Sequence, residues 1–249
     1  MQYGLCELSN IPVRSEANDR SEMVTQLLYG EHFEIISTQN NWTQVRIAFD
    51  KYEGWIATNQ VTIITEEEYN QLNEEEFFSS IDLIEFVHQP NHYLLPIVIG
   101  SSLAATSVLS HHFDGHSNKE IKKGSQLVEV ANMYINSPYL WGGKTPFGID
   151  CSGFTQMVYK INGIKIPRDA YQQATLGSAL SFIEEATPGD LAFFDNAEGK
   201  IIHVGIVLEN NHIIHAHGKV RIDRLDHTGI FNAETKKYSH QLRVIKKIV

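Results

Sequence analysis

The chain has 249 residues, of which 42% are hydrophobic, and its formal net charge is −10 at pH 7. This length suits two or three domains with buried cores. The negative charge argues against nucleic acid or an anionic membrane as a partner, because binding to phosphates requires clustered Lys and Arg. Only two cysteines, Cys6 and Cys151, are present, so we expect no disulfide framework, and a reducing compartment fits.

The first residues contain no basic segment followed by an apolar one, as a secretory signal would. The strongest apolar run, residues 93–99, is interrupted by Pro96 and is too short to span a bilayer. We therefore expect a cytoplasmic protein without a membrane partner, unless a leader has been removed from this chain.

Residues 1–65 contain short segments of strand-forming residues separated by Asn, Asp and Gly. This spacing predicts a small all-β barrel. Residues 66–116 are predicted to begin with an acidic helix over 66–76 and to continue with apolar segments that Pro90 and Pro96 interrupt. We interpret them as a second, degenerate barrel unit followed by a linker.

The predicted linker ends in a histidine-rich segment, residues 111–116, with the sequence His-His-Phe-Asp-Gly-His. Three His and one Asp suggest a metal site, but the spacing is neither helical nor that of a zinc finger. Histidine-rich loops are more often solvated. We therefore expect a surface loop here, and no metal or cofactor in the protein.

Residues 117–249 are predicted to form an α+β domain, because helical patterns come first and strand patterns follow. The predicted helices lie over 127–134, from 151 onward and after Pro167, and the predicted strands lie over 191–194, 201–208, 212–216 and 242–248. A helix would thus pack against a sheet.

Cys151 is a candidate nucleophile at the start of the second of these helices. Apolar residues recur at helical spacing from Phe154 to Ile161, until Asn162-Gly163 ends the pattern. The thiol would lie in the first turn, where helix N–H groups favour a thiolate and a nearby imidazolium would lower its pKa further. The alternative is an inert, buried cysteine.

The candidate base lies on the strand over 201–208, where His203 alternates with apolar residues. A three-residue hairpin at 209–211 would place His203 and His215 on one face as diagonal neighbours, close enough for a hydrogen bond. The same register puts His217 opposite His203, and a two-residue loop would change the register. Asp190 and Asp195 could orient the base, although both adjoin turn signals.

The motifs of this part of the chain are found in one order in a known family. They are Pro138-Tyr-Leu-Trp-Gly-Gly143, Asp150-Cys-Ser-Gly-Phe154, Pro167-Arg-Asp169, Pro188-Gly-Asp-Leu191, His203-Val-Gly-Ile206 and Ile214-His-Ala216. In these motifs the chain, from about residue 121 to 249, resembles the NlpC family of papain-like cysteine peptidases, which cut bacterial cell-wall peptides. The first quarter resembles the bacterial SH3-like domains that accompany cell-wall hydrolases.

The resemblance implies a papain-like catalytic domain over 117–249, preceded by SH3-like units over 1–65 and 66–116. It implies a Cys151–His203–His215 triad and excludes His217. It also implies that the Tyr139 hydroxyl supports the reacting carbonyl oxygen, while plain aromatic packing is the alternative for Tyr139 and Trp141.

The subgroup that the chain resembles most acts as γ-D-glutamyl-L-diamino acid endopeptidases on peptides with a free L-alanyl amine. By this resemblance, Asp150 and Ser152 would bind the ammonium group together with Glu22 and Tyr52 of the barrel. A buried ammonium needs a carboxylate. For Glu22 and Tyr52, surface charge and barrel packing are the alternatives.

Two cations are candidates for binding substrate carboxylates. They are Lys144 and Arg168, and Arg168 could instead pair with Asp169. The expected partners are therefore peptidoglycan-derived peptides. A thiol acyltransferase or amidase on the same fold, and a non-catalytic cell-wall binding module, are the competing functions.

Overall fold

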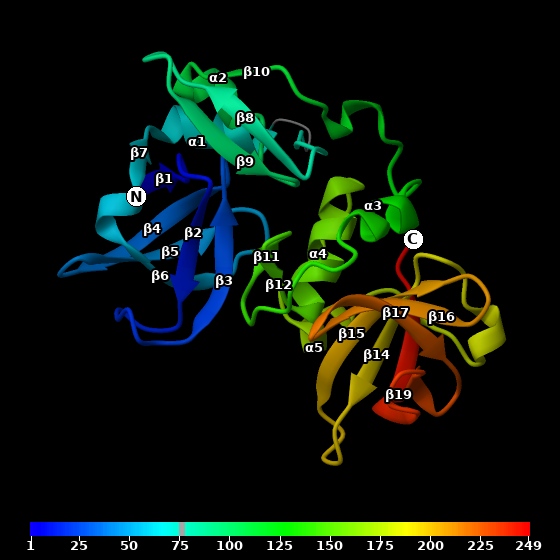
Figure 1. The fold of residues 1–249 in the computed structure, drawn as a ribbon. Coiled ribbons are helices and arrows are strands. Elements are labelled where there is room, and N and C mark those ends of the chain that lie inside the picture. The colour runs from blue at the N-terminus through cyan, green and yellow to red at the C-terminus, as the bar shows by residue number, and fades with distance from the viewer. Residues whose placement is uncertain (75–77) are drawn as a thin grey trace. The chain divides into compact units, whose positions relative to one another are not determined.

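The computed structural model describes residues 1–74 and 78–249, and it divides the chain into two compact units (Figure 1). Unit 1 consists of residues 1–120 and 141–146, and unit 2 consists of residues 121–140 and 147–249. No helix within the described residues is long and apolar enough to cross a membrane. The predicted domain boundaries after residues 65 and 116 stay predictions.

The first part of unit 1 is a seven-stranded antiparallel sheet in the order β3-β2-β6-β5-β4-β1-β7. Its strands are β1 (Gln2–Leu5), β2 (Asn10–Arg14), β3 (Met23–Leu28), β4 (His32–Gln39), β5 (Trp42–Ile47), β6 (Glu53–Ala57) and β7 (Thr62–Ile64). Buried and half-buried residues alternate along β2, β5 and β6, as expected for strands with one face toward a core. The predicted all-β architecture of this region is therefore confirmed.

The core of this sheet is apolar and includes Cys6 and Phe33, both fully buried. Burial raises the pKa of the Cys6 thiol above its ordinary value. Cys6 is therefore a small core residue in its neutral form.

The rest of unit 1 carries two helices and a three-stranded sheet in the order β10-β8-β9. The elements are α1 (Glu66–Glu74), β8 (Ile84–His88), β9 (Leu94–Val98), α2 (Ala105–Leu109) and β10 (His112–Phe113). The last two residues of the predicted acidic helix, 75–76, lie outside the described residues. Tyr29, in the turn that follows β3, shares a core cluster with Val87, Ile97 and Leu103, so this sheet packs against that turn.

The histidine-rich segment is only partly the surface loop that we predicted. His112 and His116 are exposed, and their rings lie 2.8 and 2.9 Å from the carboxylates of Asp114 and Asp82. The side chain of His111, in contrast, is 2% exposed, and its Nδ1 lies 2.9 Å from the Tyr29 hydroxyl. The prediction was wrong for His111, because a hydroxyl partner lets its ring be buried.

Residues 141–146 belong to unit 1 and include β11 (Lys144–Thr145). Lys144 is 1% exposed, and its Nζ lies 3.1 and 3.2 Å from the two carboxylate oxygens of Glu31. Glu31 also accepts the backbone N–H of Leu28, at 2.8 Å. The prediction that Lys144 meets a substrate carboxylate was therefore wrong, since its ammonium group is buried against a carboxylate of unit 1.

The turn before Lys144 requires a glycine. Gly142 has a φ of +76°, and a Cβ at this position would lie 2.2 Å from the backbone oxygen of Met23. Only glycine avoids both the strain and the clash. The neighbouring Trp141 donates its Nε1–H to Glu22 at 2.5 Å.

Unit 2 is built on a seven-stranded antiparallel sheet in the order β13-β19-β14-β15-β16-β17-β18. Because β18 also pairs with β19, the strands from β19 to β18 form a closed ring. The strands are β12 (Gly148–Ile149), which lies outside this sheet, and β13 (Ser178–Ala179), β14 (Leu191–Asp195), β15 (Ile201–Leu208), β16 (His212–His217), β17 (Lys219–Leu225), β18 (Gly229–Asn232) and β19 (Lys237–Lys247). Sequence analysis missed β17 and β18.

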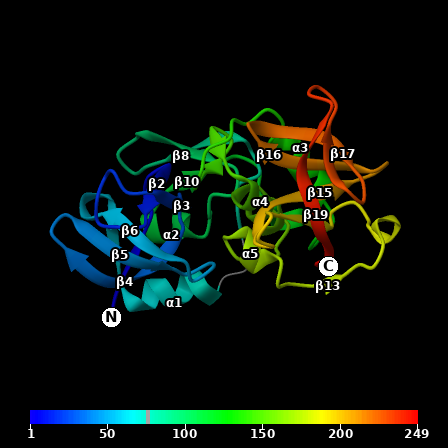
Figure 2. The same cartoon turned by 90° about the horizontal axis from the view of Figure 1, so that it is seen from below.

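The helices of unit 2 are α3 (Leu127–Met133), α4 (Cys151–Ile161) and α5 (Ala170–Gln173), where the sequence predicts helices. Every residue of α4 is buried. The helix packs against β15 and β16, and α3 and α5 both contact it (Figure 2). Unit 2 therefore has the predicted α+β architecture, with a central helix against a sheet.

We expect Lys144→Met to lower the free energy of unfolding of unit 1 by about 3–5 kcal/mol, because it removes the cation that faces the buried Glu31 carboxylate. Urea unfolding followed by tryptophan fluorescence measures this loss. The signal reports on unit 1, because Trp42, Trp55 and Trp141 all belong to it.

A matched control is Glu53→Gln. Glu53 pairs with Arg46 at 2.7 Å, but the two side chains are 44% and 39% exposed. Such a pair contributes at most about 1 kcal/mol. Equal losses in the two variants would contradict the importance of the buried pair.

Candidate active site

Cys151 is the first residue of α4. Asp150 caps the helix in extended conformation, and its Oδ1 accepts the backbone N–H of Gly153 at 2.7 Å. The thiol therefore lies in the first turn, as predicted, and Cys151 is 6% exposed. Its sulfur accepts backbone N–H groups of Ser152 and Val204, so it lies against β15 at the residue that follows His203.

His203 and His215 are hydrogen-bonded to each other. The register Leu208↔His212 leaves a three-residue loop at 209–211, as predicted. His203 Nε2 lies 2.8 Å from His215 Nδ1, and the rings meet edge to face at 81°. Both residues are buried, whereas His217 is exposed and its ring centroid lies 6.5 Å from that of His203. The structure thus brings together the two histidines that the resemblance indicates.

The far side of His215 is occupied by a carboxylate that sequence analysis missed. His215 Nε2 lies 3.0 Å from Oδ2 of Asp223, a buried residue of β17. The two carboxylates that we considered instead lie elsewhere: Asp190 accepts the backbone N–H and hydroxyl of Thr187, and Asp195 pairs with Arg243 at 3.6 Å. The sequence signal for Asp223 is an acidic residue inside an otherwise strand-like segment.

His240 of β19 is a second residue that sequence analysis missed. Its ring stacks on that of His203, with centroids 4.0 Å apart and an angle of 17° between the planes. One ring nitrogen from each of His203, His215 and His240 lies within 4.8 Å of the others, which could accommodate a metal ion. Stacked imidazoles direct their in-plane lone pairs side by side and not at one point, so this arrangement is unlike that of a zinc site.

Burial controls the protonation of the thiol and its neighbouring base. It raises the pKa of Cys151 to about 12, with a further rise from the Asp150 charge, and this outweighs the backbone donors and Arg168. Burial, and then the nearby His215, His240 and His217, hold the pKa of His203 well below its ordinary value. Burial thus favours a neutral thiol and a neutral imidazole in the free protein, and it disfavours both charges of the thiolate–imidazolium pair that the sequence predicts.

Arg168 is buried against Asp150. Its Nη2 lies 2.6 Å from Asp150 Oδ2, and its Nη1 lies 3.0 Å from Oδ1 and 2.9 Å from the Ser152 hydroxyl. Arg168 is 1% exposed. It is therefore held inside unit 2 and is not open to a substrate carboxylate, while Asp169 caps α5.

Tyr139 lies near the thiol, and its backbone forms bridges to Ile149 and Gly218. Burial raises the pKa of Tyr139 to about 12, and the Asp150 charge adds to this rise. Its hydroxyl therefore keeps its proton and can donate a hydrogen bond.

The remaining predicted residues lie in unit 1. Trp141 is 57% exposed and donates to the exposed Glu22, and Tyr52 packs partly buried against the barrel core. For Tyr52 this is the packing alternative that the sequence left open.

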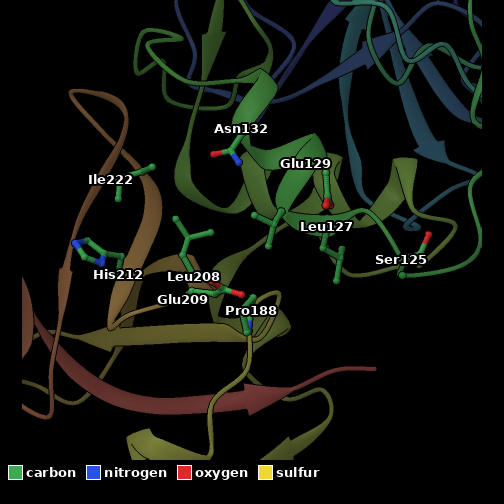
Figure 3. Close-up of a pocket in the computed structure, with 11 residues that line it drawn as sticks. Ser125, Leu127, Glu129, Asn132, Pro188, Leu208, Glu209, His212 and Ile222 are labelled. Atoms are coloured by element: carbon green, nitrogen blue, oxygen red, sulfur yellow. The ribbon is translucent and has the colours of Figure 1, made fainter.

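A separate pocket of unit 2 contains none of the candidate catalytic or substrate-binding residues (Figure 3). It lies between α3 and the β15–β16 hairpin, and Glu129, Glu209 and His212 contribute polar groups to it. His212 is at the opposite end of the hairpin from His203. This pocket is therefore distinct from the candidate active site.

Comparison with known proteins identifies both parts of the chain. Residues 136–239 match the NlpC/P60 family, and residues 13–61 match the bacterial dipeptidyl-peptidase Sh3 domain. The chain is 28% identical over 221 residues to the gamma-D-glutamyl-L-lysine dipeptidyl-peptidase of Bacillus subtilis (strain 168), covering 77% of this chain and 71% of that protein. It is also 28% identical to dipeptidyl-peptidase 6 of Lysinibacillus sphaericus, covering 85% and 88%.

Solved structures show the same fold. An NlpC/P60 family protein from Bacillus cereus superposes with a TM-score of 0.77 over 99% of both chains, at 19% identity. An NlpC/P60 endopeptidase from Photobacterium damselae subsp. piscicida gives a TM-score of 0.63 over 98% of this chain and 70% of that one, at 16% identity. The family matches show that the chain contains an NlpC/P60 domain over residues 136–239 and a bacterial SH3 domain over residues 13–61, and together with the named relatives they show that it is a cysteine peptidase.

Proposed function

We propose that this peptidase hydrolyses the γ-D-glutamyl-L-diamino acid bond of cell-wall peptides that have a free N-terminal L-Ala. The observation that carries the proposal is the thiol at the start of α4, which accepts the backbone N–H of Val204, next in the chain to His203, whose buried ring is hydrogen-bonded to His215. The names of the relatives, gamma-D-glutamyl-L-lysine dipeptidyl-peptidase and dipeptidyl-peptidase 6, support the substrate class.

The proposed reaction begins with the neutral thiol and imidazole. As the sulfur of Cys151 attacks the γ-glutamyl carbonyl carbon, its proton passes to His203. The Tyr139 hydroxyl and a backbone N–H near Cys151 stabilise the negative oxygen of the tetrahedral intermediate. His203 then gives the proton to the departing amine of the diamino acid, which leaves a thioester on Cys151.

Hydrolysis of the thioester completes the cycle. His203 takes a proton from water, the resulting hydroxide attacks the thioester carbonyl, and the proton returns to the sulfur of Cys151. His215 holds the other ring nitrogen of His203 throughout. The products are the dipeptide L-Ala-D-Glu and a peptide or amino acid with a free diamino acid amine.

The free amine of the substrate is the second part of the proposal. Asp150 and Ser152 are the proposed ammonium-binding groups of the peptidase unit, and Arg168 fixes the orientation of the Asp150 carboxylate. Glu22 and Tyr52 stay predictions for the same role. Peptides with a free L-Ala have already been released from the glycan, so we propose a role in cytoplasmic recycling of cell-wall peptides.

We expect the purified protein to cut L-Ala-γ-D-Glu-L-diamino acid peptides and Cys151→Ala to lose at least about 10³-fold in kcat, because no other group replaces the nucleophile. Mass spectrometry of the products measures both. The Cys6→Ala variant is the matched control and should keep its activity, since Cys6 lies in the core of unit 1.

The same assay with N-acetylated peptides tests the ammonium groups. Acetylation removes the positive charge, so we expect it to lower kcat/KM at least about tenfold. Equal cutting of the two peptides would contradict the free-amine requirement. Transfer of L-Ala-D-Glu to an added amine would favour an acyltransferase, and binding without cutting would favour a cell-wall binding module.

Two pH profiles test the neutral resting pair. Because the pKa of His203 is lowered, this base stays unprotonated at pH 6.5 and for some distance below it. We therefore expect kcat/KM to fall only at pH values well below 6.5. Because the pKa of Cys151 is raised to about 12, the rate of alkylation by iodoacetamide in the free enzyme should rise about tenfold per pH unit from pH 6 to 9. A plateau of the alkylation rate below pH 7 would show that the ion pair forms without substrate.

A further inference from the structure

We infer that Asp223 is a positioning residue that determines which nitrogen of each active-site histidine carries the proton. The inference rests on the proposed function for its catalytic consequence, but the arrangement of protons is a property of the resting protein.

Asp223 is fixed on both sides by hydrogen bonds. It lies opposite Ile213 in the β16–β17 register, which makes it a diagonal neighbour of His215. Its Oδ2 lies 3.0 Å from His215 Nε2 and 2.7 Å from Arg221 Nε, and its Oδ1 lies 3.0 Å from Arg221 Nη2. The carboxylate side chain is 3% exposed. It is thus an acceptor with a single orientation, held by a bidentate guanidinium.

Asp223 is ionised at neutral pH. Burial raises its pKa, but the hydrogen bonds from His215 and Arg221, together with the Arg221 charge, outweigh burial and hold the pKa below the ordinary value. An ionised carboxylate can only accept hydrogen bonds. The hydrogen between Asp223 and His215 must therefore be on His215 Nε2.

The position of this hydrogen determines where the other hydrogen atoms lie in the series Asp223–His215–His203. Burial lowers the pKa of His215 in spite of Asp223, so its ring is neutral and has only one N–H. His215 Nδ1 is then an acceptor. The 2.8 Å contact to His203 Nε2 requires a hydrogen, which His203 must supply. Nδ1 of the neutral His203 is therefore the one ring nitrogen of that residue that can take the proton of Cys151.

Without the carboxylate, the opposite arrangement becomes available. His215 can carry its hydrogen on Nδ1 and donate it to His203 Nε2, which places the hydrogen of His203 on Nδ1. In that state His203 presents an N–H group where the proposed reaction needs a base. Asp223 prevents this arrangement because it cannot donate a hydrogen bond to His215.

The test uses Asp223→Leu, which removes the acceptor at similar side-chain size, and Asp223→Asn, which keeps one amide oxygen. We expect Asp223→Leu to lower kcat about 10²- to 10⁴-fold with little change in KM, as loss of the correct tautomer does in other catalytic triads. Asp223→Asn should lie between the wild type and Asp223→Leu in kcat, because its amide oxygen can still accept from His215 Nε2, while its N–H group can instead donate to that nitrogen and favour the opposite tautomer.

The direct readout is the tautomer itself. In protein labelled with ¹⁵N-histidine, the nitrogen chemical shifts and couplings should show hydrogen on Nε2 of both His203 and His215. Asp223→Leu should shift both rings toward the Nδ1–H form. A purely structural role for Asp223 would leave these signals unchanged, and far-UV circular dichroism establishes that each variant is folded.

Glu234→Gln is the matched control. Glu234 pairs with Arg221 at 3.3 Å from the solvent side and is 75% exposed, so kcat should stay within about twofold.

A folded Asp223→Leu variant with unchanged kcat or unchanged tautomers would overturn the inference. If Asp223→Leu does not fold, Asp223→Asn decides the role of Asp223. A lower kcat together with a shift of the rings toward the Nδ1–H form, or wild-type tautomers with at least half of the wild-type kcat, would support the inference. A kcat below half with wild-type tautomers, or shifted tautomers with at least half of the wild-type kcat, would overturn it. If the wild type cuts no peptide, the proposed function fails, while the tautomers still decide the role of Asp223.

Discussion

The contact between His203 and His215 depends on one constraint, the register of β15 against β16. A shift of one residue would turn every side chain of a strand to the other face. The three-residue loop at 209–211 fixes this register. Gly205 contributes to the same contact, because a Cβ at this position would come within 2.9 Å of His215 Cβ. Glycine at position 205 therefore leaves room on β15 for the side chain of His215, which crosses from β16 toward His203.

Burial then determines which groups of unit 2 are charged. The carboxylates of Asp150 and Asp223 each face a guanidinium, of Arg168 and Arg221 respectively. A charge that is removed from water needs such a partner. For Cys151, burial outweighs the backbone donors and the Arg168 charge, so the thiol form is favoured. The same low dielectric therefore produces ion pairs at the edges of the site and neutral groups at its centre.

Sequence patterns predicted those parts of the site that depend on residues close together in the sequence. The helix from Cys151, the hairpin and the shared face of the two histidines follow from local periodicity and loop length. The contact of Arg168 with Asp150 could not be predicted in this way, because α4 separates the two residues along the chain. Asp223 was missed because its strand, β17, was not predicted. The effect of burial on the protonation of Cys151 could not be predicted either, because only the three-dimensional structure reveals how completely the thiol is buried.

A neutral resting pair has a consequence for when the enzyme becomes reactive. Alkylating and oxidising agents react with the thiolate and not with the thiol. In this site the thiolate forms only as His203 accepts the proton, and the developing negative charge then needs donors such as the Tyr139 hydroxyl and the start of α4. Charge separation is therefore tied to the presence of a carbonyl group that can receive the sulfur. The buried site thus protects the nucleophile between turnovers, while His203 is already in place to accept the proton of Cys151.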